Sequence, residues 1–191
     1  MKLTLLRHGM TQGNRDQLCY GSTDLPLLPE GEAALRQAVA THRYPTAQHY
    51  YTSGMRRTEQ TFALIYGDTP HQVLEGLRES DFGDMEMMTI PQAQEVLDFL
   101  SWATDKTGEL CLPGGESFLG VRRRVLAALE PLIARGEDCV CVMHGGSMST
   151  ALSLWFPGRQ PWEYMPKPGT GFQITFDGTK PLEFHPVPVE K

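Results

Sequence analysis

The sequence is poor in cysteine, and its cysteines show no pairing pattern. Only four occur among 191 residues, and no two are spaced as C-x-x-C. Cys139 and Cys141 alternate within an apolar run, as small core residues of a strand do. This usage fits a reducing compartment.

Long apolar runs and basic tracts are also missing. One lysine and four apolar-leaning residues stand between Met1 and Arg7, too few for a signal peptide's apolar region, and no later run approaches membrane-spanning length. We therefore expect a cytoplasmic protein with no membrane partner. The formal net charge is −6 and no run of five basic residues occurs, so we expect no nucleic-acid partner. An anion would need a local basic pocket.

The length and composition are those of a globular domain. The chain has 40% hydrophobic and 21% charged residues, which argues against disorder. A chain of this length can bury a substantial core without disulfides or metals. We therefore expect residues 1–191 to form a single domain, for which a monomer and a homodimer are both open.

Strand-like and helix-like segments alternate along the chain. The patterns predict strands at residues 2–7, 48–53, 71–77, 137–144, 171–178 and 181–187, with the proline-rich last strand at a sheet edge. They predict helices at residues 29–42, 54–67, 90–105, 118–136 and 145–156, with Ser53 as an N-cap. Residues 8–29 are expected to form a long polar loop. The alternation predicts an α/β fold with a mostly parallel central sheet.

Two of these strands lead into a histidine followed by glycine. His8 and Gly9 follow the first strand, and His144 and Gly145 stand at the end of the fourth. Ligands of parallel sheets bind beyond the carboxyl ends of the strands. If the two strands are neighbours, the two histidines share one pocket. The sequence alone does not show whether they are.

His8 and Arg7 each allow a structural and a chemical interpretation. A strand-end histidine can cap a carbonyl, or it can act as a nucleophile, because a neutral imidazole is reactive near pH 7. Gly9 would let a backbone N–H approach a phosphate closely. Arg7 is costly at the end of a buried strand unless an acidic residue or a bound phosphate pairs with it.

Three further residues are candidates for the same pocket. Arg57 lies in the first turn of a predicted helix and leans toward the strand ends, whereas Arg56 points about 100° away and is expected on the surface. His144 precedes two glycines that open a helix and offer N–H groups to an anion. A core histidine or a metal ligand is also consistent, but no third ligand has convincing spacing. Glu79 becomes a candidate general acid if it lies in a cationic pocket.

Together these segments resemble the histidine phosphatase superfamily, also called the phosphoglycerate mutase-like family. Five stretches carry the resemblance, in order: LLRHGMTQGN, TSGMRRTEQT, LRESDFGDME, PGGES and VMHGG. The first three are similar to the family's R-H-G-x-T-x-x-N, S-x-x-x-R-x-x-x-T and L-x-E-x-x-[FY]-G-x-x-E patterns. The chain length, LRESDFGDME and PGGESF look most like the α-ribazole phosphatase branch.

The resemblance implies a three-layer α/β/α sandwich and a phosphohistidine mechanism without a metal or another cofactor. In that mechanism His8 attacks phosphorus, and Glu79 protonates the leaving alcohol and then activates water. Arg7, Arg57 and His144 hold the phosphoryl oxygens. The substrate-binding positions that the resemblance carries over are Asn14, Thr11, Gly21, Ser22, Thr23 and the Gly145 backbone.

Three functions remain open at this point. We favour a phosphomonoesterase acting on a small phosphorylated metabolite such as α-ribazole 5'-phosphate, because the superfamily's mutases generally have an added segment and a longer C-terminal tail. A phosphoglycerate mutase is the second hypothesis. A non-catalytic phospho-ligand binding module is the third, and the complete set of expected catalytic residues argues against it. Met10, Met85 and Met87 depart from the family's usual residues; with residues 15–29 and 80–115, they bear on the shape of the substrate pocket.

Overall fold

The most apolar strands of the sequence form the centre of the sheet. The computed structural model describes residues 1–191, and its six-stranded sheet has the order β4-β3-β5-β1-β6-β7. The strands are β1 (Lys2–Arg7), β3 (His49–Thr52), β4 (Gln72–Val73), β5 (Cys139–Met143), β6 (Gly171–Asp177) and β7 (Lys180–Val187). The first four strands in that order pair in parallel, and β6 and β7 add antiparallel pairings. The predicted mostly parallel sheet is confirmed, and β7 is at an edge as expected.

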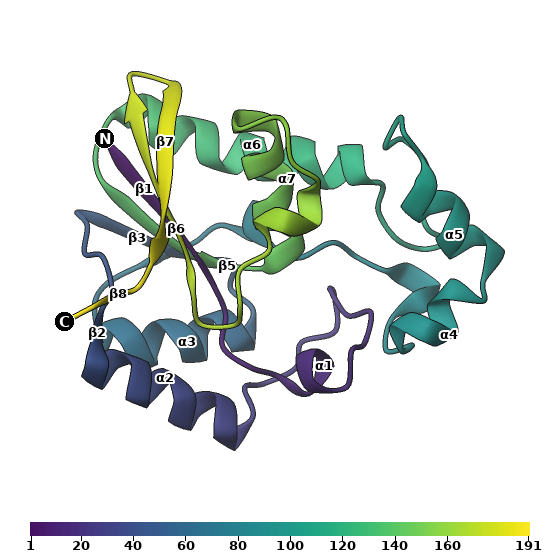
Figure 1. The fold of residues 1–191 in the computed structure, drawn as a ribbon, viewed down its shortest axis with the longest axis horizontal. Coiled ribbons are helices and arrows are strands. Elements are labelled where there is room, and N and C mark those ends of the chain that lie inside the picture. Colours follow the sequence, from purple (N-terminus) through teal and green to yellow (C-terminus); the bar gives the residue numbers. More distant parts are fainter.

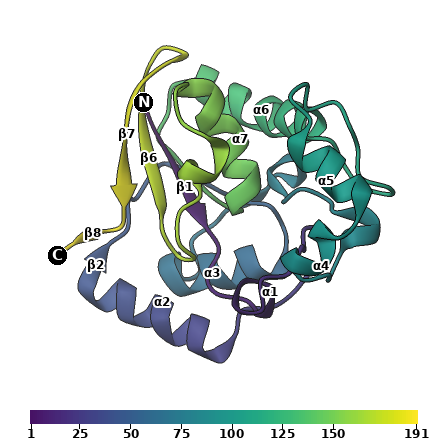
Figure 2. The same cartoon turned by 45° about the vertical axis from the view of Figure 1, so that its right-hand side comes forward.

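Helices cover both faces of this sheet, which gives the three layers of an α/β/α sandwich. The helices α6 (Phe118–Arg135) and α7 (Gly145–Trp155) lie on one side, and α2 (Pro29–Thr41) and α3 (Arg56–Tyr66) lie on the other (Figures 1 and 2). A two-stranded sheet of β2 (His42–Arg43) and β8 (Val189–Glu190), which the sequence did not indicate, joins the C terminus to the end of α2. No helix is long and apolar enough to cross a membrane.

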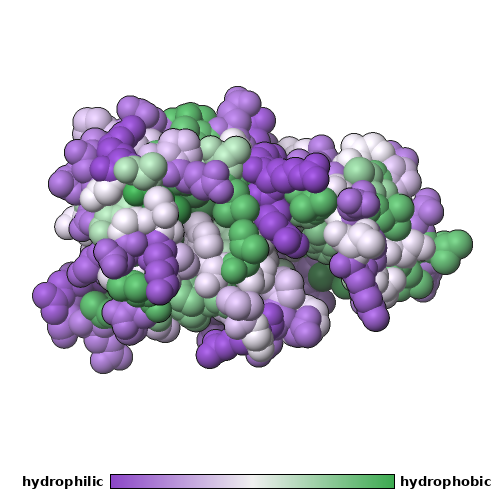
Figure 3. Space-filling model, turned by 90° about the horizontal axis from the view of Figure 1, so that it is seen from above, coloured by the Kyte–Doolittle hydropathy of each residue, from purple (hydrophilic) through white to green (hydrophobic).

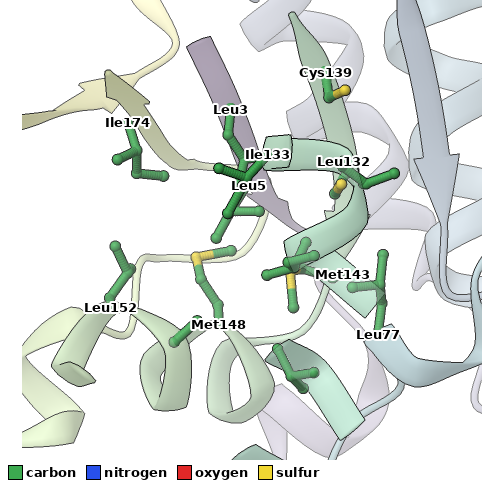
Figure 4. Packing of buried hydrophobic residues seen from close by; sticks show 14 of the residues in the cluster. Leu3, Leu5, Leu77, Leu132, Ile133, Cys139, Met143, Met148, Leu152 and Ile174 are labelled. Carbon is green, nitrogen blue, oxygen red and sulfur yellow. The ribbon is translucent and has the colours of Figure 1, made fainter. Parts of the chain in front are cut away.

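The core follows from the alternation of side chains along the central strands. Leu3 and Leu5 point to the α6–α7 face, where they pack with Met148 and Leu152 (Figure 4). Leu6 points to the other face and belongs to the cluster of Phe62 in α3. Both faces of β1 are therefore buried, which explains its continuous apolar sequence. The expected core cysteines, 139 and 141, are free thiols with no exposed surface.

A smaller apolar cluster holds the segment between the sheet strands β4 and β5. The helices α4 (Ile90–Gln94) and α5 (Leu97–Thr104) lie at the end of the molecule away from the C terminus (Figures 1 and 2) and pack around Phe99 and Trp102. Cys19 joins this cluster, and its backbone exchanges hydrogen bonds of 2.8 and 2.7 Å with Met88 and Met87. Part of the 15–29 segment, at Cys19, is thus tied to the 80–115 segment. Figure 3 shows hydrophobic residues exposed at this end, where Leu97 is 76% exposed.

Some local predictions were wrong. The strand expected at residues 71–77 is reduced to β4, and a 3-10 turn follows at Glu75–Leu77. The helix expected at 90–105 is split into α4 and α5, and the loop 8–29 contains a one-turn helix, α1 (Gln12–Arg15). Ser53 is not an N-cap, because α3 begins after Met55 and the Ser53 hydroxyl contacts His144 instead. For Ser53, a long-range contact that the local pattern does not contain decides the outcome.

Two leucines of α7 test how much of the stability comes from the α6–α7 face. Leu152 has no exposed surface and Leu154 is 49% exposed. Leu152→Ala leaves a cavity beneath the sheet and should lower the free energy of unfolding by about 2–5 kcal/mol. Leu154→Ala, on the same helix, should lower it by less than about 1 kcal/mol. Urea unfolding of both variants measures the difference; similar losses would contradict this account of the core.

Candidate active site

The pairing of β1 with β5 brings the two motif histidines together. The strands run parallel with Arg7 opposite Met143, and the next residue, His8, donates its backbone N–H to the Met143 carbonyl at 3.0 Å. The ring centroids of His8 and His144 are 5.2 Å apart. His8 is 2% exposed and His144 has no exposed surface. The shared pocket, which the sequence left conditional on strand order, is present.

His8 has one fixed ring nitrogen and one free one. Its Nδ1 lies 2.7 Å from the Gly9 carbonyl oxygen, which can only accept, so Nδ1 carries the proton and Nε2 keeps its lone pair. Burial, followed by the charges of Arg57 and Arg7, holds the pKa of His8 well below the ordinary 6.5. The neutral imidazole is therefore the resting form, with Nε2 available as a nucleophile.

His144 is fixed at both ring nitrogens. Arg57 Nε donates to His144 Nδ1 at 3.2 Å, which leaves the proton on Nε2, and Nε2 lies 2.8 Å from Ser53 Oγ. Burial lowers the pKa of His144 well below 6.5, and Arg57 and then His8 add to this effect. In this state Nδ1 is an acceptor, so the imidazole does not offer a free donor to an anion.

Arg57 is a fully buried cation held by backbone carbonyls. It has no exposed surface, whereas Arg56 is exposed as predicted. Its Nη1 and Nη2 donate to the carbonyl oxygens of Thr23 and Gly21, each at 2.9 Å. The bond from Nε to His144 is the third, so two of the five guanidinium N–H groups have no partner. The charge is thus fixed in place with donors to spare.

Arg7 also keeps an unpaired donor. Its Nη1 donates to the Pro166 carbonyl at 2.9 Å, and its Nε is buried without any hydrogen-bond partner. The guanidinium packs against Gly145, where an added Cβ would lie 3.1 Å from Arg7 Cζ. Arg7 therefore contacts a carbonyl and not a carboxylate, which removes the structural ion pair as the reason for its place. Its unpaired N–H and its charge, which with that of Arg57 acts on His8, could take an anion as a partner.

Glu79 occupies the N terminus of α7. Its Oε2 accepts from the Gly146 N–H at 2.8 Å, and its Oε1 accepts from Ser147 at 2.8 Å and from Ser80 at 3.0 Å. We expected the start of this helix to present several N–H groups to an external anion. That expectation needs correction, because the protein's own carboxylate binds two of them. Of the three N–H groups that open the helix, the one on Gly145 is left.

The polar residues after His8 mainly organise the loop. The Gly9 N–H does not face an open site, because it donates to Thr61 Oγ1 at 2.9 Å. Thr11 caps α1, and its N–H and hydroxyl both bind Asn14 Oδ1, at 3.1 and 3.0 Å. The Asn14 side-chain NH₂ has no partner within the protein. Asn14 thus retains donors for a ligand, whereas the Thr11 hydroxyl is engaged internally, including by Tyr20 at 2.7 Å.

The backbone of residues 21–23 binds Glu86. The N–H groups of Gly21, Ser22 and Thr23 donate to the Glu86 carboxylate at 2.8, 3.1 and 3.0 Å. These three residues were expected to contact substrate, but their backbone donors are engaged and two of their carbonyls hold Arg57. At Gly21 an added Cβ would lie 1.6 Å from the Ser80 oxygen, which requires glycine there.

Sequence reasoning missed four residues that complete the site: Ser53, Thr61, Tyr20 and Glu86. Tyr20 places its ring 5.0 Å from Arg57 Cζ, a cation–π contact. Ser53, Thr61 and Glu86 stand inside the quoted stretches TSGMRRTEQT and LRESDFGDME, so their presence was visible but their contacts were not. Nothing in the pattern singled out Tyr20.

A polar cavity opens beside Glu79. Its volume is about 440 Å³, and Met55 is the one hydrophobic residue among ten in its lining. Asp81 and Glu116 contribute carboxylates to it. Arg124 also lines it, but its guanidinium is engaged by Glu116 and by the backbone carbonyls of residues 76, 78 and 79. No group of three or more His, Cys, Asp or Glu side chains is arranged to hold a metal ion.

The buried histidines predict how stability responds to acid. In the unfolded chain each has a pKa near 6.5, whereas the folded-state pKa is well below it. Their contribution is therefore fully present above about pH 6.5 and is lost as the pH falls toward the folded pKa. Each contributes a slope of up to ~1.4 kcal/mol per pH unit.

His8→Asn removes one of the two groups while keeping a donor for the Gly9 carbonyl. Urea unfolding between pH 7.5 and 5.5 should show a smaller loss of stability for this variant than for the wild type. The matched control is His185→Asn, because the side chain of His185 is 67% exposed; it should leave the wild-type slope unchanged. Equal slopes for all three proteins would contradict the buried neutral state of His8.

Comparisons with known proteins place the chain in a family. A model of the histidine phosphatase superfamily (branch 1) matches residues 3–181. An adenosylcobalamin/α-ribazole phosphatase of Salmonella typhimurium is 28% identical over 181 residues, 88% of this chain and 87% of that protein. A 2,3-bisphosphoglycerate-dependent phosphoglycerate mutase of Cytophaga hutchinsonii is 27% identical over 157 residues, 76% of this chain and 73% of that protein.

A solved structure gives the same result for the fold. The α-ribazole phosphatase from Shigella flexneri matches with a TM-score of 0.80, covering 100% of this chain and 96% of that chain, at 22% sequence identity. The family-model match extends over nearly the whole sequence and includes both histidine motifs. This chain belongs to the histidine phosphatase superfamily.

Proposed function

We propose that the protein is a phosphomonoesterase that works through a phosphohistidine on His8. The observation that carries the proposal is the state of His8, a buried neutral imidazole whose Nε2 lone pair is free and whose neighbours are two arginines. Several donors around it have no partner in the protein: Arg7 Nε, two N–H groups of Arg57, the Asn14 amide and the Gly145 N–H. A phosphoryl group with three oxygens is the ligand that such a set would bind.

In the first step, His8 Nε2 forms a bond to phosphorus as the bond to the leaving alcohol oxygen breaks. The charges of Arg7 and Arg57 stabilise the phosphoryl oxygens during the transfer. Glu79 gives its proton to the leaving oxygen. In the second step Glu79 accepts a proton from water, and the water oxygen displaces His8 from phosphorus.

Hydrogen bonds hold the Glu79 carboxylate in one place for both steps. Three backbone N–H groups donate to it, those of Ser80, Gly146 and Ser147. For the first step it must take up a proton. A monoanionic phosphate ester carries one and can supply it on binding.

The leaving alcohol is proposed to lie in the polar cavity beside Glu79. The lining is almost without apolar residues, which suits an alcohol rich in hydroxyl groups, such as the ribose of α-ribazole 5'-phosphate. The similarity to the Salmonella typhimurium phosphatase over most of both chains supports this substrate class. Two arginines also line this cavity, but Arg124 pairs with Glu116 and Arg78 with Glu75. Asp81 has no cationic partner, so its carboxylate disfavours a second anionic group on the substrate.

That charge separates phosphatase from mutase. Phosphoglycerate carries a carboxylate, and a mutase must also keep the phosphohistidine from water. We therefore expect the protein to release phosphate faster from α-ribazole 5'-phosphate than from 3-phosphoglycerate. We expect no isomerisation of 2- or 3-phosphoglycerate. Isomerisation without phosphate release would identify a mutase, and tight phosphate binding without either reaction would identify a binding module.

The first prediction for this mechanism concerns the nucleophile. His8→Ala should abolish phosphate release while the melting temperature shows a folded protein, because no other imidazole has a free Nε2 in the site. Rapid acid-free denaturation during turnover should trap base-stable, acid-labile phosphate on wild-type His8. His185→Ala is the control and should retain activity. Near wild-type turnover by His8→Ala would refute the mechanism.

The second prediction concerns the proton that Glu79 transfers. Glu79→Gln keeps the size of the side chain but removes the transferable proton. Phosphohistidine formation from an alkyl phosphate should slow by ~10²–10⁴-fold, because an alkoxide leaves poorly without an acid. The burst with p-nitrophenyl phosphate should slow much less, because nitrophenolate leaves unaided.

The burst phase is the proper observable, since Glu79 also acts in the later hydrolysis. Glu130→Gln, at an exposed position of α6, controls for loss of one carboxylate. Equal slowing of both bursts would assign Glu79 to binding or structure. An unaffected alkyl phosphate would move the acid to Asp81 or Glu116.

A further inference from the structure

Glu86 is the one half-buried carboxylate on which three consecutive backbone N–H groups converge. Its Oε1 accepts from Gly21 and Ser22, at 2.8 and 3.1 Å, and also from Phe82 at 3.1 Å. Its Oε2 accepts from the Thr23 N–H at 3.0 Å and from the Thr23 hydroxyl at 2.5 Å. Five donors on one carboxylate fix the path of residues 21–23.

The other side of the same loop holds Arg57. The Gly21 and Thr23 carbonyls accept from Arg57 Nη2 and Nη1, both at 2.9 Å. Glu86 makes no direct hydrogen bond with Arg57. The Gly21–Ser22 peptide group makes both kinds of contact, because its N–H donates to Glu86 and its carbonyl accepts from Arg57.

This separation matters for the charge of Arg57. A carboxylate bound directly to the guanidinium would neutralise it and occupy its donors. Neutral carbonyls fix the guanidinium plane without cancelling its charge. The nearest carboxylate, that of Asp24, is 3.8 Å from Nη1 and 47% exposed, so it compensates the charge only weakly.

We propose that Glu86 is a positioning residue, which aligns Arg57 for the phosphoryl group through the backbone of residues 21–23 and leaves the arginine charge available. The inference rests on the proposed function. Burial acts to raise the pKa of Glu86, but the hydrogen bonds from Thr23, Phe82 and Gly21 outweigh it and lower the pKa below 4.5. Glu86 is therefore ionised at neutral pH and accepts all five bonds.

A double-mutant cycle tests whether Glu86 acts through Arg57. Glu86→Gln replaces one acceptor oxygen by an NH₂ group and so breaks part of the loop's support. The affinity for inorganic phosphate and for vanadate, and kcat/KM, should each fall about 10–100-fold, as expected for a displaced binding group. Arg57→Lys replaces the planar guanidinium fork by a compact ammonium that has no plane to align. In that background, adding Glu86→Gln should change these values less than about 3-fold.

Two controls keep the result interpretable. Asp84 lies in the same segment as Glu86, but its carboxylate makes no hydrogen bond within the protein. Asp84→Asn should therefore leave phosphate affinity unchanged in the wild type and in Arg57→Lys. Thr23→Val removes only the hydroxyl bond to Glu86; it should weaken phosphate binding severalfold in the wild type and not with Arg57→Lys. This variant decides the matter if Glu86→Gln lowers the melting temperature.

The outcomes separate this inference from the function it rests on. Wild-type protein that neither binds phosphate nor hydrolyses esters would refute the proposed function. A different result would overturn the role of Glu86 alone. In that result the wild-type protein binds phosphate, but Glu86→Gln and Thr23→Val lower the phosphate affinity by the same factor in the wild type as in Arg57→Lys. Unchanged affinity in both variants would do the same.

Discussion

The structure depends on burying the positive charge of Arg57 without neutralising it. A guanidinium with no exposed surface needs acceptors for its N–H groups, and an unpaired one is costly. Here the acceptors are two backbone carbonyls and an imidazole nitrogen, none of which carries a charge. The cost of this choice falls on the surrounding chain, because two segments that are distant in sequence from Arg57, residues 21–23 and His144, must converge on it to supply the acceptors.

The states of both histidines follow from the same constraint. Burial, followed by the charge of the nearby Arg57, favours neutral imidazoles, so the pKa values of His8 and His144 are lowered together. For His8 this leaves the Nε2 lone pair free, as the proposed nucleophile requires, since the remaining proton is fixed on Nδ1 by the Gly9 carbonyl. For His144 it creates an acceptor for Arg57 and a donor toward Ser53. Two similar motifs thus arrive at different roles because their hydrogen-bond partners differ.

Much of this arrangement could be predicted from the sequence, for a physical reason. A strand buried on both faces, such as residues 2–7 or 139–143, needs a continuous apolar run. The polar residue that ends such a run must lie where the strand leaves the sheet. That rule located His8 and His144 correctly. It could not give the strand order that makes them neighbours, because the pairing of β1 with β5 joins residues more than a hundred positions apart.

Other contacts were out of reach because they depend on loops. The carboxylate of Glu79 fills the N terminus of α7, and that of Glu86 fills the concave side of residues 21–23; in both cases an anion site that the local sequence offers to a ligand is used by the protein itself. Reading N–H groups from the sequence counts donors but does not show which are already bound. Ser53 illustrates the converse error, since a residue with the composition of an N-cap contacts His144 across the sheet.

The distribution of charge along the pocket follows from these internal anions. Glu79 and Glu86 bind backbone N–H groups and not the arginine guanidinium groups near His8. The positive charge of these arginines therefore remains beside His8. The lining of the cavity beside Glu79 contains more carboxylates than cations. A positive end and a negative end therefore lie next to each other, with the proposed proton donor at their boundary. A phosphate ester has the matching polarity when its alcohol half is uncharged, because its two halves then carry unequal charge. If the protein acts as proposed, the same field that binds the phosphoryl group also discriminates against an anionic leaving group.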